Sequence, residues 1–294
     1  MGLFSGLEKM GMNKVSKDNL FASAKKETPA AGAAAATAAE PEEKKKNEMD
    51  YLIDKTHECP ICGTKFKNRG VKAGRVRMIG QDLDLRPKYE QLDQLKYGVL
   101  VCSNCGYAAV ESFFKGLYDR QKKMIEDSLP KPVTYKEPEA EYSYDDALMR
   151  YQLAVACCMA KQSKDSEKAY TCLRMAWLLR GKAESLDKDA ADYKEQLKSC
   201  KDDETEALTL AYEGFIGALK VEDFPIAGMD EHTVMYLCAA LANRLGRYDD
   251  AMTILSRLMT SREVNPRIKD KAFDLKENVR ERLKEIEEAN KALQ

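Results

Sequence analysis

The stretches ECPICGTKF (58–66) and VCSNCGYAA (101–109) both contain the pattern C-x-x-C-G, and thirty-nine residues separate the two cysteine pairs. Two thiolates three positions apart in a tight turn can reach one metal ion, and zinc prefers four such ligands in a tetrahedron. The glycine after each second cysteine lets the backbone turn so that amide groups approach the sulfur atoms. The doubled pattern therefore predicts one four-cysteine site made by Cys59, Cys62, Cys102 and Cys105.

The predicted site is closed, because protein side chains fill all four positions and leave none for water or a substrate. A closed site is typical of a structural zinc ion, one per chain. Such an ion stabilises a small module that has few core residues of its own. Two alternatives stay open: iron in the same four-cysteine cage, and four buried thiols without metal. His57 lies two residues before Cys59 and could replace a cysteine as ligand, although four thiolates already suffice.

The insert between the cysteine pairs is basic. The segment KFKNRGVKAGRVR (65–77) contains six Lys or Arg residues, and no acid occurs from Gly63 to Gln81. A phosphate backbone would favour this charge, but Phe66 is the one aromatic residue available for base stacking. The alternative is a solvated face that balances the negative charge of a zinc–thiolate centre. Around it, 51–125 is expected to form a small β-containing zinc-ribbon-like module, with strands in 75–85 and 96–102.

Asp82 and Asp84 point to one side of the first predicted strand, where they could bind a cation or pair with Arg75 or Arg77. Pairing is the interpretation we favour. The sequence contains no Ser-His-Asp arrangement, HExxH, Walker loop or GxGxxG, and its two histidines leave general acid–base chemistry to carboxylates. No pair of carboxylates stands out, so we expect the protein not to be an enzyme.

From Ser143 onward, apolar residues recur at three- and four-residue steps, as in amphipathic helices. The stripes are Tyr144, Leu148, Tyr151, Val155 and Met159; Ala169, Leu173, Ala176 and Trp177; Leu208, Ala211, Tyr212, Phe215 and Leu219; Leu237, Leu241 and Leu245; Ala251, Leu255 and Leu258; and Ile268, Leu275, Val279, Leu283 and Ile286. Pro266 suits the first turn of the last helix. Residues 143–294 are thus expected to form a helical domain, joined to the module by a spacer at 126–142 that contains three prolines.

The first fifty residues read as a flexible tail and linker. Residues 27–49 are rich in alanine, proline and charge, a composition that cannot bury enough surface to offset its ordering entropy. Ahead of them, Leu3, Leu7 and Met10 share one helical face within residues 1–12. This segment is either a frayed end or a short helix that docks on a partner, on a membrane surface, or back on the body.

The stretch LGRYDDA (245–251) is the most specific feature of the helical half. Its pattern L-G-x-Y-x-x-A resembles the turn between the helices of a tetratricopeptide repeat. Gly246 caps the first helix, Tyr248 wedges the helix pair, and Ala251 is small enough for close helix contact. The fold class is therefore predicted as mainly α: a small β-containing, four-cysteine zinc-ribbon-like module followed by a tetratricopeptide-like α-helical array.

The chain resembles the bacterial domain-of-unknown-function family 2225 over roughly residues 51–262. The resemblance rests on CPICG (59–63), VCSNCGYAA (101–109), AWLLR (176–180) and EDFPIAGMDE…YLCAAL…RLGRYDDA (222–251). It implies a zinc-ribbon-like start and a tetratricopeptide-like remainder, and it implies no activity.

Composition bounds the cellular setting. The net charge is −1, so no global attraction to nucleic acid or acidic lipid is expected. No secretory signal and no window of about 20 apolar residues is present, which predicts a cytoplasmic protein without a transmembrane segment. Its cysteines should then be reduced or metal-bound, and the five outside the C-x-x-C-G pairs lie in helical pattern as small core residues: Cys157, Cys158, Cys172, Cys200 and Cys238.

These observations favour a non-enzymatic, zinc-binding scaffold or adaptor whose helical array binds a protein or peptide partner. The alternative is a zinc-ribbon protein that associates with RNA or DNA through residues 65–77. Salt separates the two, because phosphate contacts weaken steeply as salt rises.

Overall fold

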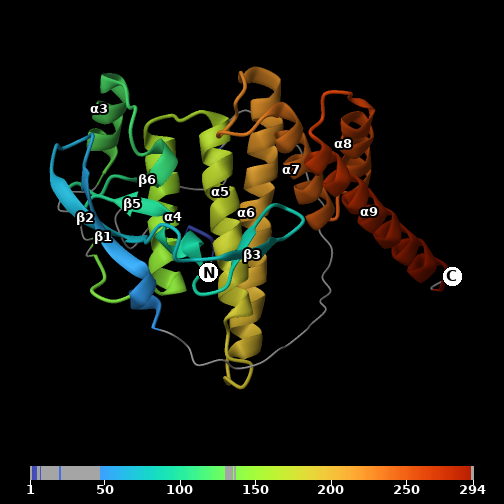
Figure 1. Cartoon of the computed structure of the whole chain (residues 1–294), viewed down its shortest axis with the longest axis horizontal. Coiled ribbons are helices and arrows are strands. Elements are labelled where there is room, and N and C mark those ends of the chain that lie inside the picture. Colours follow the sequence, from blue (N-terminus) through green and yellow to red (C-terminus); the bar gives the residue numbers. More distant parts are fainter. Residues whose placement is uncertain are drawn as a thin grey trace.

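The computed structural model describes residues 2–4, 7, 20, 47–129, 135 and 137–292. Most of the described chain is helical, and Figure 1 shows the larger helices side by side in chain order. Each of them contacts the next. They are α4 (Tyr144–Ala160), α5 (Asp165–Glu184), α6 (Tyr193–Val221), α7 (Glu231–Arg244), α8 (Tyr248–Thr260) and α9 (Pro266–Ala292). The predicted mainly α class is confirmed, and every predicted apolar stripe lies on one of these helices except Leu245, which directly follows the last residue of α7.

Local sequence signals set the helix ends. Ser143 starts α4 with a reciprocal capping box: its Oγ accepts from the Asp146 amide at 3.0 Å, and the Asp146 carboxylate accepts from the Ser143 amide at 3.0 Å. Gly246 ends α7 with φ 73°, and the Arg247 amide donates to the Ala242 carbonyl at 2.8 Å. This Schellman motif reverses the chain between α7 and α8, as the glycine in LGRYDDA predicts.

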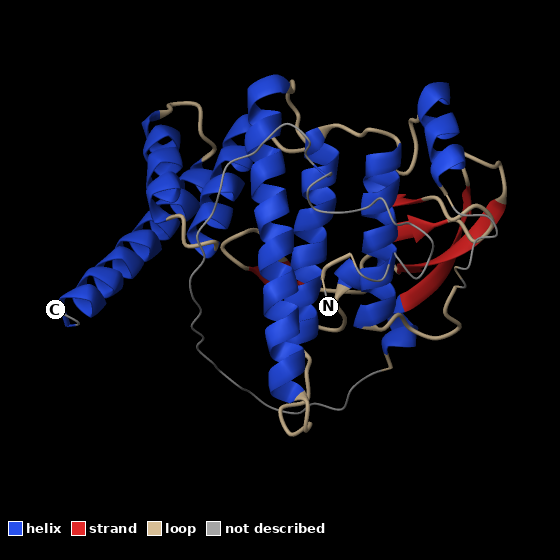
Figure 2. Cartoon of the chain, turned by 180° about the vertical axis from the view of Figure 1, so that it is seen from behind, coloured by secondary structure: helices blue, strands red, loops and turns tan. Residues whose placement is uncertain are grey.

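The strands form three antiparallel pairs near the start of the described body. The pairs are β1 (Leu52–Glu58) with β2 (Lys65–Val71), β3 (Met78–Gln81) with β4 (Pro87–Tyr89), and β5 (Val99–Val101) with β6 (Ala108–Val110). The strands predicted in 75–85 and 96–102 correspond to β3 and β5, which are shorter. Figure 2 shows most of the strands at one end of the row of helices, whereas β3 lies across α6 in Figure 1.

One main core joins the hairpins to the helices. Both strands of the β5–β6 hairpin are fully buried and pack against α4, and the same cluster continues through α5 to α9. Leu3, Phe4 and Leu7 are buried in it as well, and the Leu3 carbonyl accepts from Gln152 of α4 at 2.6 Å. The described part of segment 1–12, residues 2–4 and 7, therefore packs on the body, while Met10 of the predicted face lies outside the described residues. Of the predicted linker, 27–49, residues 27–46 lie outside the described residues.

The predicted spacer is partly structured. Helix α3 (Asp119–Ser128) extends into it, while residues 130–134 and 136 lie outside the described part. Tyr142 is fully buried, and its ring stacks on that of Tyr97 with centroids 4.9 Å apart. This end of the spacer therefore packs into the body instead of only bridging its two halves.

Candidate metal centre

Each C-x-x-C-G sequence forms the turn of a hairpin, the first between β1 and β2 and the second between β5 and β6. The Cys59 amide donates to the Thr64 carbonyl at 3.0 Å, and the Gly63 amide donates to the Cys59 carbonyl at 3.0 Å. In the second turn, the Cys102 amide donates to Tyr107 at 2.9 Å and the Gly106 amide to Cys102 at 2.8 Å. The two turns thus have the same hydrogen-bonding pattern.

The glycine that ends each motif adopts a left-handed conformation. The backbone φ is 68° at Gly63 and 74° at Gly106. Residues with a Cβ atom pay a steric cost in this region, whereas glycine does not. The turn that brings each pair of sulfur atoms together thus depends on the last residue of C-x-x-C-G.

The two hairpins bring the four sequence-predicted ligands together. The sulfur atoms of Cys59, Cys62, Cys102 and Cys105 all lie within 4.8 Å of one another. The Sγ atoms of Cys59 and Cys105 are 3.5 Å apart, and those of Cys62 and Cys102 are 3.7 Å apart. A Zn–S distance of about 2.3 Å gives a tetrahedron edge of about 3.8 Å. The arrangement therefore fits a metal ion bound by four thiolates.

The charge on this sulfur cluster is unevenly distributed. The neighbouring thiols of Cys105 and Cys59 lower the pKa of Cys102, and the proximity of Cys102 raises the pKa of Cys59. One thiolate at Cys102 is thus stabilised by protons on its neighbours. A divalent cation would replace those protons and let the remaining thiols ionise, since metal binding to thiols releases protons.

Two polar side chains that sequence reasoning missed support the cluster. Asn104 Nδ2 donates to Thr64 Oγ1 at 3.0 Å, which links the two turns directly. Burial by itself raises the pKa of Cys62, but hydrogen bonds from Thr64 and Asn104 outweigh it and lower that pKa. Thr64 follows the first motif and Asn104 lies within the second. Their position next to the cysteines was the sequence feature that could have predicted this role.

Comparison with known protein families matches residues 52–279 to a family described as "Uncharacterized protein conserved in bacteria (DUF2225)". The chain belongs to this family. An uncharacterized protein from Borreliella burgdorferi is 26% identical over 119 residues, which cover 32% of this chain and 43% of that protein. The match therefore spans less than half of the relative's length. No solved structure matches the chain.

In this DUF2225 protein, the other sequence-predicted features lie away from the sulfur cluster. His57 is outside the group of four; its buried Nε2 atom has no hydrogen-bond partner among the described residues, and burial lowers its pKa. The remaining five cysteines are buried, as predicted. Cys157 accepts a hydrogen bond from the Ala108 amide at 3.3 Å, and burial raises its pKa to about 11. These five cysteines are core residues of the helices.

Some of the basic side chains in segment 65–77 of the DUF2225 protein bind other parts of the protein. Arg69 bonds Asp54 at 3.3 Å and two backbone carbonyls near the end of the spacer, and Lys72 Nζ donates to the Asp50 carbonyl at 2.9 Å. The other basic side chains of the segment are exposed: Lys65, Lys67, Arg75 and Arg77. Arg69 and Lys72 of this segment therefore hold β2 and the residue after it against neighbouring parts of the chain.

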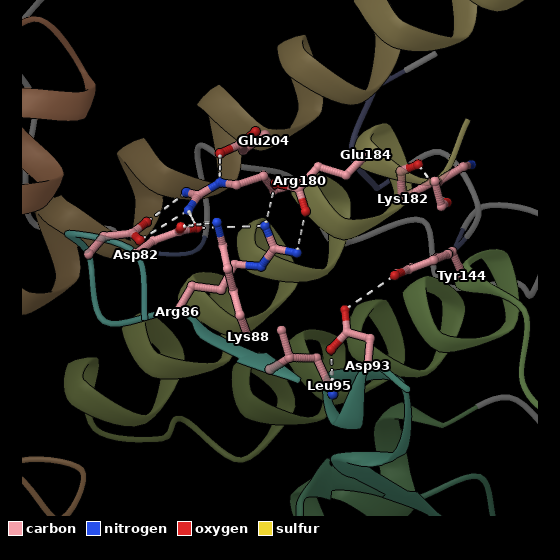
Figure 3. Close-up of polar contacts among 12 residues, drawn as sticks. Asp82, Arg86, Lys88, Asp93, Leu95, Tyr144, Arg180, Lys182, Glu184 and Glu204 are labelled. Carbon is pink, nitrogen blue, oxygen red and sulfur yellow. Dashed lines mark hydrogen bonds and ion pairs between the residues drawn. The ribbon is translucent and has the colours of Figure 1, made fainter. Parts of the chain in front are cut away.

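Asp82 and Asp84 do pair with arginine, but the partner predicted from sequence is wrong. They lie in the turn after β3 and both bond Arg180 of α5, with Arg180 Nη1 to Asp82 Oδ2 at 2.9 Å. Figure 3 shows Arg180 between Asp82 and Glu204, whose Oε1 accepts from Arg180 Nε at 2.8 Å. The sequence favoured Arg75 and Arg77 as partners because they are near the two aspartates along the chain. In the fold, the aspartates instead pair with Arg180 of α5. This charge cluster fixes the β3–β4 hairpin on α5 and α6.

Among the helices that the structure describes, none is both long enough and apolar enough to cross a bilayer.

Proposed function

We propose that the cysteine cluster binds one structural zinc ion per chain and that the protein is a non-enzymatic adaptor. The observation that carries the proposal is the group of four sulfur atoms within 4.8 Å of one another. Four protein ligands complete a tetrahedron, so no coordination position is left for a substrate or a reactive water molecule. Such an ion acts by holding the two hairpins together.

The helical half supplies the binding surface in this proposal. The turn between α7 and α8 has the geometry that a tetratricopeptide-like corner needs: a left-handed Gly246 and a fully buried Ala251 where the helices meet. Beyond it, α9 projects from the body (Figure 1), and Phe273 on this helix is 54% exposed. Exposed aromatic residues are enriched in protein interfaces, which supports a protein or peptide partner.

We place this adaptor in a reducing compartment such as the cytoplasm. Nine cysteines without a disulfide among them suit an environment in which thiols stay reduced. Nucleic acid is the less favoured partner, because Arg69 and Lys72 are engaged within the protein and the net charge is −1.

The metal part of the proposal is tested by elemental analysis of the purified full chain. We expect about one zinc per chain, lost in Cys102→Ser and retained in Cys200→Ala, which alters a buried cysteine outside the cluster. Iron in place of zinc, or free titration of all four thiols in the folded wild type, would contradict the proposal.

The adaptor part needs a separate test. Tagged full-length protein, Phe273→Glu and the control Val221→Glu are used to capture partners from bacterial extract treated with nuclease. We expect a protein bound by the wild type and the control but lost in Phe273→Glu. Retention on heparin that falls steeply between low and moderate salt, with no such protein partner, would favour the nucleic-acid alternative instead.

A further inference from the structure

A cavity of about 470 Å³ lies between the β1–β2 hairpin, β4, the 3-10 turn η2 (Gln94–Tyr97) and α5. This volume falls within the range of about 300–1,000 Å³ that is typical of small-molecule sites. Its walls contain three cationic side chains, Lys55, Arg69 and Arg174, against one carboxylate, that of Glu111, and Arg69 is also paired with Asp54. A cavity with this balance of charge attracts anions.

Arg174 is the cation that the fold holds most firmly in the wall. Its Nε atom donates to the Tyr151 hydroxyl at 3.1 Å, and its guanidinium lies 5.8 Å from the centroid of the Tyr170 ring. A Cβ atom at position 98 would come within 2.3 Å of Arg174 Nη2, so Gly98 provides the space that this group fills. The guanidinium is thus positioned before any ligand arrives.

Arg174 also differs from the other enclosed arginines of the protein. Arg86 pairs with Glu184 at 2.8 Å, Arg150 with Glu137 at 2.9 Å and Arg180 with Asp84 at 2.6 Å. Over the residues that the structure describes, no carboxylate forms an ion pair with Arg174; its neighbours are phenol oxygens. A partly buried guanidinium is stabilised by an anionic partner, and Arg174 is one of the residues that line the cavity.

Aromatic side chains form part of the remaining wall. Tyr89, Tyr170 and Trp177 all line the cavity, and Trp177 Nε1 donates to Asp84 Oδ2 at 3.2 Å, which fixes the orientation of its ring. Leu95 and Leu100 add apolar surface. Ring faces and apolar walls favour a flat unsaturated group over a flexible polar chain.

We propose that this cavity binds a small organic anion that carries a flat ring, with its carboxylate or phosphate group on Arg174. The proposal goes beyond the adaptor function and does not depend on it. The β1–β2 hairpin forms one wall and carries Cys59 and Cys62 in its turn, so the cavity and the metal centre share a structural element.

The test uses 8-anilinonaphthalene-1-sulfonate, whose sulfonate and fused rings match the proposed chemistry, in fluorescence titrations of the folded full chain. We expect Arg174→Gln to weaken binding at least about tenfold, the effect of losing one charge-assisted contact. The matched control is Arg247→Gln, because Arg247 also lies over a tyrosine ring, that of Tyr212 at 5.0 Å, but outside the cavity. The control should bind the dye as the wild type does.

Competition then distinguishes the two head groups. Adenosine monophosphate presents a phosphate and indole-3-acetate a carboxylate; displacement of the dye by either one supports the proposal and identifies the group. If circular dichroism shows that Arg174→Gln is unfolded, Tyr89→Leu takes its place, with about two- to tenfold weaker binding expected. Equal binding by the wild type and the folded cavity variant, or displacement by neither anion, would overturn the proposal.

Discussion

Arg180 on α5 and Asp84 in the β3–β4 turn form a two-pronged ion pair, with Nη1–Oδ1 at 3.0 Å and Nη2–Oδ2 at 2.6 Å. The Asp84 side chain is 1% exposed, and Trp177 donates a further hydrogen bond to it. Parallel hydrogen bonds of this kind fix the orientation of both groups as well as attracting them. Arg180 therefore fixes the position of the β3–β4 hairpin on the helices. Figure 3 shows that Arg180 also contacts Asp82, which lies in the same turn as Asp84.

Replacing Asp84 with alanine should destabilise the protein by about 3–5 kcal/mol, because it leaves part of the buried Arg180 charge without its partner. Denaturant unfolding at neutral pH measures the loss. The exposed carboxylate Asp223 provides the control, and Asp223→Ala should change the free energy of unfolding by less than about 0.5 kcal/mol. A cost for Asp84→Ala as small as that of the control would show that the ion pair contributes no stability.

The same pair should make stability depend on acid. Burial raises the pKa of Asp84, but the charge of Arg180 outweighs it and holds the pKa below its usual value of 3.8. A carboxylate with a lowered folded-state pKa contributes stability above the unfolded-state pKa, and this contribution is lost as the pH falls through the folded-state value. The free energy of unfolding of Asp84→Asn should therefore fall less than that of the wild type below about pH 4. Loss of the proposed metal in acid would affect both proteins alike, so parallel curves would contradict the assignment.

The sequence predicted the group of four cysteines because its whole signal is local: two cysteine pairs, each followed by glycine. It also predicted the helices, whose apolar stripes repeat over many turns. It did not predict β2, because Asn68 occupies an inward position where alternation would place an apolar residue. That side chain accepts from the Val101 amide at 3.0 Å and donates to the Tyr142 hydroxyl at 3.2 Å. Such partners, like Arg180 for Asp84, lie far along the chain and become visible only in the fold.

Gly63→Ala should lower the free energy of unfolding by about 1–2 kcal/mol, through the left-handed backbone that the first turn requires. A Cβ atom at this position would meet nothing within 4 Å, so the cost comes from the φ of 68° and not from a clash. Gly80→Ala is the matched control, since its Cβ atom is equally unobstructed and its backbone is not left-handed. Thermal unfolding of the zinc-loaded proteins compares the two, and equal midpoints would exclude a backbone origin.

Leu7→Ala should cost about 2–5 kcal/mol, the range for truncating a buried leucine. The Leu7 side chain is 1% exposed and belongs to the core that contains α4. Val221→Ala tests the same kind of truncation at a side chain that is 79% exposed, and it should be nearly neutral. If both variants unfold at the same urea concentration as the wild type, the N-terminal segment does not contribute to the stability of the core.

Removing the proposed zinc ion should weaken the helices as well as the hairpins. Two contacts link the second hairpin to α4: Arg150 Nη2 donates to the Val99 carbonyl at 2.7 Å, and the Ala108 amide donates to Cys157. Loss of the ion frees the turn at Cys102, loosens β5 and β6, and uncovers the apolar face of α4 that they bury. A structural zinc can contribute several kcal/mol to folding, so a chelator should lower the helical melting midpoint by about 10 °C or more.

Far-ultraviolet circular dichroism follows this change, because it reports the helices and not the sulfur cluster. Cys102→Ser provides the control: it should melt near the chelated wild type and should not respond to chelator, since its site is already broken. A wild type that loses its zinc while its helical melt stays in place would show that α4 holds its structure without the hairpin. The coupling through Arg150 and Cys157 would then be too weak to carry the effect of the metal into the helices.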